Sequence, residues 1–271
     1  MTERYLKNIT KQIRKKIIDM AYKGNGAHIS SCLSITDLLV VLYWDILKIN
    51  PKKPKELSRD RFILSKGHAA SALYAVLAQK GFFQHRYLET YGSNNTFLGV
   101  HPEYDTLPGI EFSTGSLGHG LSVGAGMALA AKLNKLECRT FVLISDGECN
   151  EGSVWEGVLF SAHMKLDNLI IIIDYNKLQA FGRTKDIMNL EPFAAKWRAF
   201  GWATIELDGH NLKQLQKVFH SIPLVKNKPT AFIAHTIAGK GVSFLEDKLE
   251  WHYLNLKKEQ YKMALEEIKK Q

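Results

Sequence analysis

The chain has 271 residues, of which 36 are lysine or arginine and 27 are aspartate or glutamate, so its formal net charge is +9, and 45% of its residues are hydrophobic. This length and apolar content suffice for one α/β domain with a substantial core, and we expect a single domain over residues 1–271. The longest aliphatic run, residues 169–173, is too short to cross a bilayer, and the first residues lack the apolar core of a secretory signal. We therefore expect a cytoplasmic protein with no membrane contact.

The excess positive charge gathers in residues 7–16 and 48–55. Neither segment interleaves aromatic side chains, as a stacking surface for single-stranded nucleic acid does. We expect solvated surface or contact with an acidic partner chain, and no nucleic acid. Cys32, Cys138 and Cys149 are widely spaced and form no Cys-x-x-Cys pattern, which argues for a reducing compartment and against zinc.

The first half of the chain is mostly helical by pattern. Helical spacing of Ile9, Ile13, Ile17 and Met20 predicts an amphipathic first helix. Gly24 and Gly26 then predict a turn that approaches a ligand. Three further helices are expected: from Thr36 through Trp44, from the residues after 66–68 through Leu77, and from Met127 to Leu133 after the glycine-rich segment 114–126.

Two apolar, β-branched runs, residues 140–145 and 169–174, are typical of buried parallel strands, which lose water on both faces. Between them, Trp155, Val158, Leu159, Ala162 and Leu166 recur at helical spacing. The segment is therefore predicted to be a strand-helix-strand unit. Strands at 203–207 and 230–236 would extend the same sheet.

Polar residues follow each of the two central strands. Asp146 and Asn176 would lie side by side at the carboxyl ends of neighbouring strands, where α/β proteins keep their ligands. One carboxylate and one amide oxygen suit a hard cation such as Mg²⁺ or Ca²⁺, which takes its remaining ligands from water and a phosphate ester. Gly147 lets the backbone approach that ester. The sequence thus indicates a metal and diphosphate site.

The motifs resemble those of the transketolase family. The resemblance rests on Asp146-Gly147 with Asp174-x-Asn176, Glu151-Gly152 with Trp155-Glu156, residues 60–69, His101-Pro-Glu, residues 107–110, residues 114–120 and Trp251-His252, in the family's order. It implies an α/β fold with a parallel sheet flanked by helices on both faces. It also implies a bound thiamine diphosphate and Mg²⁺, with Ca²⁺ as a possible substitute.

Transketolases in their usual form are more than twice this length. The chain resembles the N-terminal subunit of a split transketolase, in which a second chain carries the pyrimidine-binding and C-terminal domains. The family implies that such subunits dimerise into a heterotetramer. It also implies transfer of a two-carbon ketol unit from a ketose or ketose phosphate donor to an aldehyde acceptor.

The resemblance assigns roles to residues of this chain. For the metal, it implies the side chains of Asp146 and Asn176 and the carbonyl of Leu178. For the cofactor, it implies contacts from His68, His252, Gly115, Leu117, Gly147 and Glu148. For catalysis, it implies His28, His101, His252 and Glu151. Among these, His101 is the expected proton-transfer residue, and Glu151 is expected to reach the subunit interface near a partner glutamate.

The chain departs from the family's pattern in three places. Ser145-Asp146-Gly147 replaces Gly-Asp-Gly, and Ala27-His28-Ile29-Ser30 replaces Gly-His-Pro-Gly in a loop of the substrate funnel. Ala238 stands where some relatives carry a lysine near the diphosphate, which leaves Lys240 as a substitute candidate. The altered His28 loop leaves the sugar substrate open.

Two alternative functions follow from these departures. One is another thiamine-diphosphate-dependent two-carbon or acyl transferase, such as a deoxyxylulose-phosphate-synthase-like or a specialised sugar-branching enzyme. The other is a non-catalytic binding module. A neighbouring reading frame with pyrimidine-domain motifs would favour the enzyme, and its absence would favour the module.

Overall fold

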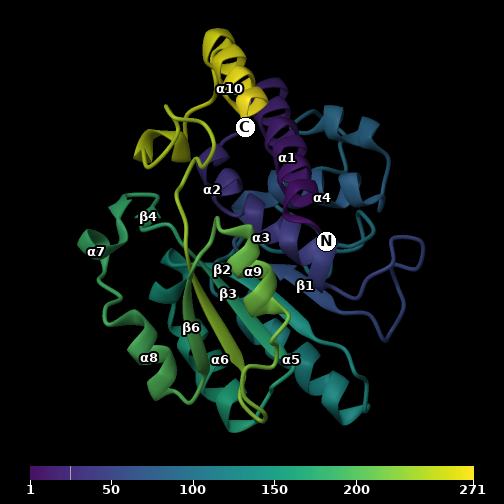
Figure 1. Cartoon of the computed structure of the whole chain (residues 1–271), viewed down its shortest axis with the longest axis vertical. Coiled ribbons are helices and arrows are strands. Elements are labelled where there is room, and N and C mark those ends of the chain that lie inside the picture. The colour runs from purple at the N-terminus through teal and green to yellow at the C-terminus, as the bar shows by residue number, and fades with distance from the viewer. Residues whose placement is uncertain (25) are drawn as a thin grey trace.

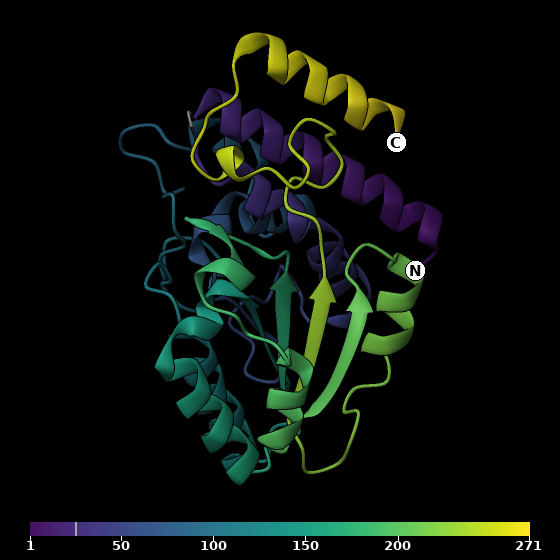
Figure 2. The same cartoon turned by 90° about the vertical axis from the view of Figure 1, so that its left-hand side faces the viewer.

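The computed structural model describes residues 1–24 and 26–271 and is built around a five-stranded parallel sheet. The strand order is β1-β2-β3-β7-β6, with bounds Arg61–Leu64 (β1), Thr140–Ser145 (β2), Leu169–Tyr175 (β3), Thr230–His235 (β7) and Ala203–Asp208 (β6). Figures 1 and 2 show helices on both sides of this sheet. The predicted α/β fold with a flanked parallel sheet is confirmed.

The central strands are hydrophobic on both faces because both faces are covered. Every residue of β2 and β3 is buried. Alternate side chains of these strands enter two separate cores, so that Phe141, Leu143 and Ile170 pack on one side while Val142 and Ile171 pack on the other. This division explains why the two strands read as continuous apolar runs.

Helices of two groups cover the sheet. The first core includes residues of α1 (Glu3–Lys23), α2 (Ile29–Ser34), α3 (Thr36–Val41), α4 (Ala70–Lys80), α9 (Leu212–Phe219) and α10 (Lys258–Lys270). The second core includes residues of α5 (Gly120–Leu133), α6 (Gly152–His163) and α8 (Phe193–Ala199). The helices α1 and α10 lie side by side in both views (Figures 1 and 2), with Tyr22 stacked on Tyr261.

The remaining elements are short. A two-stranded hairpin, β4 (Leu178–Gln179) and β5 (Gly182–Arg183), leads into α7 (Thr184–Ile187). A π-helical turn at Leu42–Ile46 continues α3, and 3-10 turns lie at Gly67–Ala69, His85–Thr90, Gly147–Asn150 and Leu249–His252. Within the described residues, no helix is both long and apolar enough to cross a membrane. The cysteines Cys32, Cys138 and Cys149 are free and buried.

Most predicted elements are present, with shifted bounds. The strands at 140–145 and 169–174 pair in parallel, and α6 lies between them as expected. Within α6, however, Val158 is buried whereas Leu159 is 60% exposed, so Leu159 does not belong to the core face. The helix expected from Met127 begins at Gly120, and α2 was not expected at all.

The ligand approach at Gly24 and Gly26 stays a prediction, and the structure shows a packing role for both glycines. A Cβ atom on Gly24 would lie 2.3 Å from the carbonyl oxygen of Tyr91, and one on Gly26 would lie 2.7 Å from the Tyr91 ring. These glycines therefore make room for Tyr91. Residue 25, between them, lies outside the described residues.

Two glycines of α5 give a matched test of the packing. A Cβ atom at Gly124 would lie 2.4 Å from Val142 Cγ2, whereas a Cβ atom at Gly126 would meet nothing within 4 Å. We expect Gly124→Ala to lower the free energy of unfolding by about 1–3 kcal/mol through overpacking. Gly126→Ala should raise it by up to ~1 kcal/mol, because alanine favours the helix. Urea unfolding of both variants measures this, and an unchanged Gly124→Ala variant would contradict the close packing of α5 on β2.

Candidate active site

A cavity of about 530 Å³ opens at the carboxyl end of the sheet. The arrowheads of β6 and β7 point toward this end of the molecule, where α1 and α10 also lie (Figure 2). Segments that follow β1, β2, β3 and β7 supply Lys66, Asp146, Asn176 and Ala238 to its wall. Eleven of the residues predicted from the sequence line it: His28, His68, His101, Gly115, Leu117, Asp146, Gly147, Glu151, Asn176, Leu178 and His252.

Asp146 and Asn176 are brought together by the register of β2 and β3. Ser145 pairs with Asp174, so each polar residue follows its strand at the same level of the sheet. The Asp146 carboxylate accepts hydrogen bonds from Gly147 N at 2.8 Å, Lys177 N at 2.9 Å and Thr184 Oγ1 at 2.9 Å. These bonds fix the carboxylate and leave Oδ1 with an acceptor position free for a cation.

Asn176 is oriented by a neighbour that sequence reasoning had treated only as part of a motif. Its Nδ2 donates to Asp174 Oδ2 at 2.9 Å, and its Oδ1 accepts from Leu178 N at 2.9 Å. Because a carboxylate only accepts, the amide nitrogen must face Asp174. The amide oxygen is thereby kept for Leu178 and for a ligand in the cavity.

Asp174 is the centre of a buried network. It is completely buried and accepts from Lys66 Nζ at 2.5 Å, from Ser34 Oγ at 2.7 Å and from Thr236 Oγ1, as well as from Asn176. Lys66 is also completely buried, lines the cavity, and donates to the Ser31 carbonyl at 3.3 Å. Sequence reasoning missed this ion pair, although both residues stand in the quoted motifs.

Burial and the nearby Asp174 raise the pKa of Asp146 to about 7, although its hydrogen bonds from Thr184, Gly147 and Lys177 act in the opposite direction. Such a carboxyl group is poised between its two forms near neutral pH. A bound cation would favour the ionised form.

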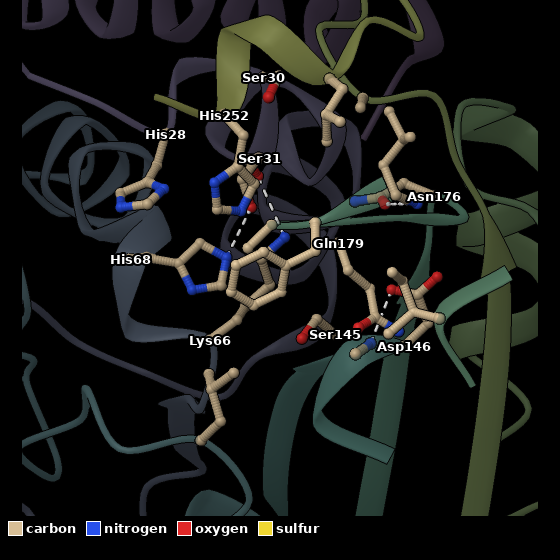
Figure 3. A pocket seen from close by; sticks show the side chains of 18 of the residues that line it. His28, Ser30, Ser31, Lys66, His68, Ser145, Asp146, Asn176, Gln179 and His252 are labelled. Carbon is tan, nitrogen blue, oxygen red and sulfur yellow. Dashed lines mark hydrogen bonds between the residues drawn. The ribbon is translucent and has the colours of Figure 1, made fainter. Parts of the chain in front are cut away.

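Histidines form the opposite side of the cavity. Figure 3 shows His28, His68 and His252 together, facing Asp146 and Asn176 across the pocket. The ring centroids of His28 and His252 are 4.7 Å apart, and those of His28 and His68 are 5.2 Å apart. His28 precedes α2 with a left-handed φ of 64°, and its N–H donates to the His252 carbonyl at 3.1 Å.

The environment keeps these histidines neutral. The pKa of His28 is lowered to about 4, and burial is the largest cause. The nearby His252, His101 and Lys66 lower it further, in that order. The pKa of His68 lies well below its usual value, chiefly through burial, and burial also lowers the pKa values of His101 and His252. A neutral imidazole can both donate and accept a proton, as acid–base work near neutral pH requires.

Two of the histidines have spare hydrogen-bonding capacity. The Nδ1 atoms of His28 and His252 are buried without a hydrogen-bond partner in the described part of the chain. An orphaned buried polar atom is costly, so a ligand in this cavity would be expected to satisfy both. His68 Nε2 lies 2.9 Å from Ser31 Oγ and is therefore already paired.

Glu148 is the one predicted site residue that the structure does not bring to the cavity wall. It is completely buried, and its carboxylate accepts from Ser65 Oγ at 2.5 Å, Gly118 N at 3.0 Å and Ser145 N at 2.9 Å. Glu148 thus anchors the loops next to the cavity and does not line its wall. Lys240 is also displaced from the expected role, because it pairs with Glu246 at 3.4 Å outside the wall.

Other residues of the wall were not singled out from the sequence. Ser31 contacts His68, and Gln179 donates to Asn150 at 2.9 Å beside Gly147. Ser31 directly follows the loop that departs from the family's pattern, residues 27–30. That departure is the signal that could have identified Ser31. Asn150 ends a 3-10 turn and Gln179 lies in the two-residue strand β4, and neither element has a spacing that carries a signal.

The donor set fits a diphosphate cofactor with Mg²⁺. Among the described residues, no group of three or more His, Cys, Asp or Glu side chains is arranged to hold a metal by itself. A cation at Asp146 would therefore rely on amide, carbonyl and ligand oxygens, as Mg²⁺ does when it bridges to phosphate. The buried Lys66 and the orphaned histidine nitrogens supply further partners for an anionic ligand.

Comparison with known proteins agrees with this geometry. Residues 6–269 match the family model described as transketolase, thiamine diphosphate binding domain. The chain is 44% identical over 255 residues to a subunit of the apulose-4-phosphate transketolase of Phocaeicola vulgatus, covering 94% of this chain and 90% of the relative. It is 41% identical over 259 residues to the 6-deoxy-6-sulfo-D-fructose transketolase subunit SqwG of Clostridium sp., covering 96% and 94%.

Longer transketolases match over less than half of their length. The transketolase of Homo sapiens is 36% identical over 267 residues, which cover 97% of this chain and 42% of that protein. The crystal structure of transketolase from Campylobacter jejuni superposes with a TM-score of 0.93 at 30% identity, covering 99% of this chain and 43% of that one. The chain belongs to the transketolase family, and it matches that family's thiamine diphosphate binding domain.

Proposed function

We propose that this chain is the cofactor-binding subunit of a split transketolase, which transfers a two-carbon ketol unit from a ketose to an aldehyde with thiamine diphosphate and Mg²⁺. The observation that carries the proposal is the cavity itself, in which Asp146 and Asn176 face His28, His68 and His252. Relatives named as single subunits match over nearly their whole length. None of the relatives reported above is a deoxyxylulose-phosphate synthase or a non-catalytic module.

The proposed partner is a second chain that carries the pyrimidine-binding and C-terminal domains. Longer transketolases extend well beyond the part that this chain matches. Apolar side chains are also exposed: Phe181, at the cavity wall, is 83% exposed, and Leu159, on α6, is 60% exposed. Such surface is typical of a protein interface. Two copies of each chain would form a heterotetramer, and the cytoplasmic location stays a prediction.

The metal side of the cavity would hold the diphosphate. Asp146 Oδ1, Asn176 Oδ1 and the Leu178 carbonyl are proposed to bind Mg²⁺. Gly147, whose N–H donates to Asp146 Oδ1 in this structure, is proposed to turn that N–H to phosphate when the cofactor binds. Asp174 supports this arrangement by accepting a hydrogen bond from Asn176, and Glu148 supports it by accepting one from the Ser145 N–H next to Asp146. Gly115 and Leu117 would line the cofactor's rings, and Glu151, exposed at the start of α6, would meet the partner subunit.

The histidine side would carry out proton transfer and substrate binding. When bound, thiamine diphosphate supplies the nucleophilic carbon and the electron sink that allow the bond next to a ketose carbonyl to break. His68 is proposed to bind the diphosphate, and His252 the diphosphate and the donor. His28 would hold sugar hydroxyls, and His101 would move the proton at the reacting carbonyl oxygen. Their low pKa values leave them neutral and able to do so.

The names of two relatives bear on the substrate. One is named for apulose 4-phosphate and the other for 6-deoxy-6-sulfo-D-fructose. Both sugars carry an anionic group away from the carbonyl. We propose a sugar of this general kind for the present chain.

Asp146→Ala should abolish magnesium-dependent retention of thiamine diphosphate while leaving the fold largely intact. The cation that separates carboxylate and diphosphate loses its one charged protein ligand, so affinity should fall roughly 100-fold or more. Calorimetric titration with and without Mg²⁺ measures the loss. Asp208→Ala, at the exposed end of β6, is the matched control. Unchanged affinity in Asp146→Ala would sink the metal assignment.

His101→Ala and His68→Ala should differ in kind. Loss of His101 should lower kcat by about 10²–10⁴-fold, as is usual for a general acid or base, with little change in cofactor affinity. Loss of His68 should mainly weaken cofactor binding. Steady-state kinetics at saturating cofactor, together with cofactor titration, separates the two effects. Equal losses of cofactor affinity in both variants would refute the assigned roles.

The isolated chain should be inactive in ketol transfer, even with saturating thiamine diphosphate and Mg²⁺. The proposed reaction needs the pyrimidine-binding domain of the second chain, and the exposed apolar surface of this chain should favour self-association. Activity should appear on addition of the second subunit. The assay compares turnover with and without that subunit, with sedimentation to follow assembly. Robust turnover by the 271-residue chain alone would show the split-enzyme proposal to be wrong.

A further inference from the structure

Two lysines line the cavity, and they differ in surroundings. Lys66 is completely buried and bound to Asp174. Lys248 is exposed at the cavity wall, beside Leu249 and Tyr253. In residues 1–24 and 26–271, the Lys248 ammonium makes no ion pair or hydrogen bond. It is therefore a cation at the cavity with its donors free.

The carboxylates next to Lys248 in the chain are engaged elsewhere. Asp247 forms a two-pronged ion pair with Arg183, with nitrogen–oxygen distances of 2.5 and 2.8 Å. Glu246 accepts from Gly241 N at 2.9 Å and pairs with Lys240 at 3.4 Å. A planar guanidinium bound at both oxygens leaves Asp247 little capacity to neutralise its neighbour. Neither carboxylate pairs with Lys248, and in the described part of the chain the exposed Glu250, two residues further on, makes no ion pair with it either.

The backbone around Lys248 is fixed relative to the proposed catalytic groups. Asp247 N–H donates to the Ala238 carbonyl at 2.9 Å, so the chain is tied to the segment after β7. Lys248 then precedes the 3-10 turn Leu249–His252, which ends on His252. That turn is fastened by Ser30 Oγ, which donates to the Trp251 carbonyl at 3.2 Å, and by His28 N–H, which donates to the His252 carbonyl. Lys248 and His252 are therefore presented to one cavity by one anchored turn.

We infer that Lys248 binds the anionic group, phosphate or sulfonate, at the end of the sugar substrate away from the reacting carbonyl, and so determines specificity for anionic sugars. The inference rests on the proposed function and deepens it. The histidines hold the reacting end, and a free cation at the cavity is suited to the other end. A charge-assisted hydrogen bond from an ammonium to such an oxyanion strengthens binding without taking part in the chemistry.

The test uses the complex of this chain with its second subunit, loaded with thiamine diphosphate and Mg²⁺. The specificity ratio is kcat/KM for D-glyceraldehyde 3-phosphate divided by kcat/KM for D-glyceraldehyde as acceptor. We expect Lys248→Ala to lower this ratio about 10-fold or more, mainly through KM for the phosphorylated acceptor, since a hydrogen bond to a charged group contributes about 1.5–3 kcal/mol. Lys248→Arg should retain most of the ratio. Lys262→Ala, an exposed position of α10 outside the cavity wall, should not change it.

A binding measurement separates this inference from the proposed function. Calorimetry of the same complex with D-glucitol 6-phosphate and with D-glucitol, which have no carbonyl to react, should show a phosphate-dependent gain that Lys248→Ala removes. A sulfonated polyol in a parallel titration distinguishes sulfonate from phosphate. Absence of turnover with every sugar would count against the proposed function alone. A Lys248→Ala variant with an unchanged ratio, or with equal losses for the charged and neutral compounds, would overturn the role of Lys248.

Discussion

The carboxylate of Asp174 is the interaction on which the site depends. It accepts hydrogen bonds from four segments of the chain. Lys66 donates from the loop after β1, and Ser34 donates from the helix α2. Asn176 donates from the segment after β3, and Thr236 donates from the segment after β7. A charge this deeply buried is tolerated only when it is fully paired, and removing one partner of such a pair typically costs about 3–5 kcal/mol. The network therefore fixes the relative positions of four of the segments that line the cavity. Asn176 reaches its orientation as a result.

The same ion pair shapes the electrostatics of the cavity. Lys66 is among the charges that lower the pKa values of His28, His68 and His252, while Asp174 raises that of Asp146. The histidines are thus held uncharged on one side, and a carboxyl group is held close to its titration point on the other. An incoming diphosphate would meet the neutral histidines as hydrogen-bond donors. Its cation would meet the Asp146 carboxyl group and would favour the ionised form of that group.

The sequence predicted the parts of this arrangement that have a strong period or a strong motif. β2 and β3 are continuous apolar runs, so their burial, their parallel pairing and the meeting of Asp146 with Asn176 could be predicted. The helix α2 could not, because Ile29–Ser34 is short, rich in serine and without a face, and it is helical through packing in the first core. The early start of α5 was hidden by its glycines, which have low helix propensity but allow close contact with β2.

Side-chain pairing was the least predictable feature. Glu148 stands one residue from Gly147 and yet faces away from the cavity, because Ser65, Gly118 and Ser145 supply its partners from below. Leu159 fits the helical period of its neighbours but faces outward. In both cases the outcome depends on which segments of other parts of the chain pack nearby, and local spacing contains no information about that.

The contact between α1 and α10 has a consequence for how the chain folds during synthesis. Tyr22 stacks on Tyr261 at a centroid distance of 4.2 Å, and Tyr261 also donates to Asp19 at 2.8 Å. The helix α1 thus gains this partner only after the segments between it and α10 have been made. In the same way β3 gains its neighbour β7 only after β6 has been made. Such distant pairings carry a large loop-closure entropy, so cooperative folding should wait until both members of each pair have been made.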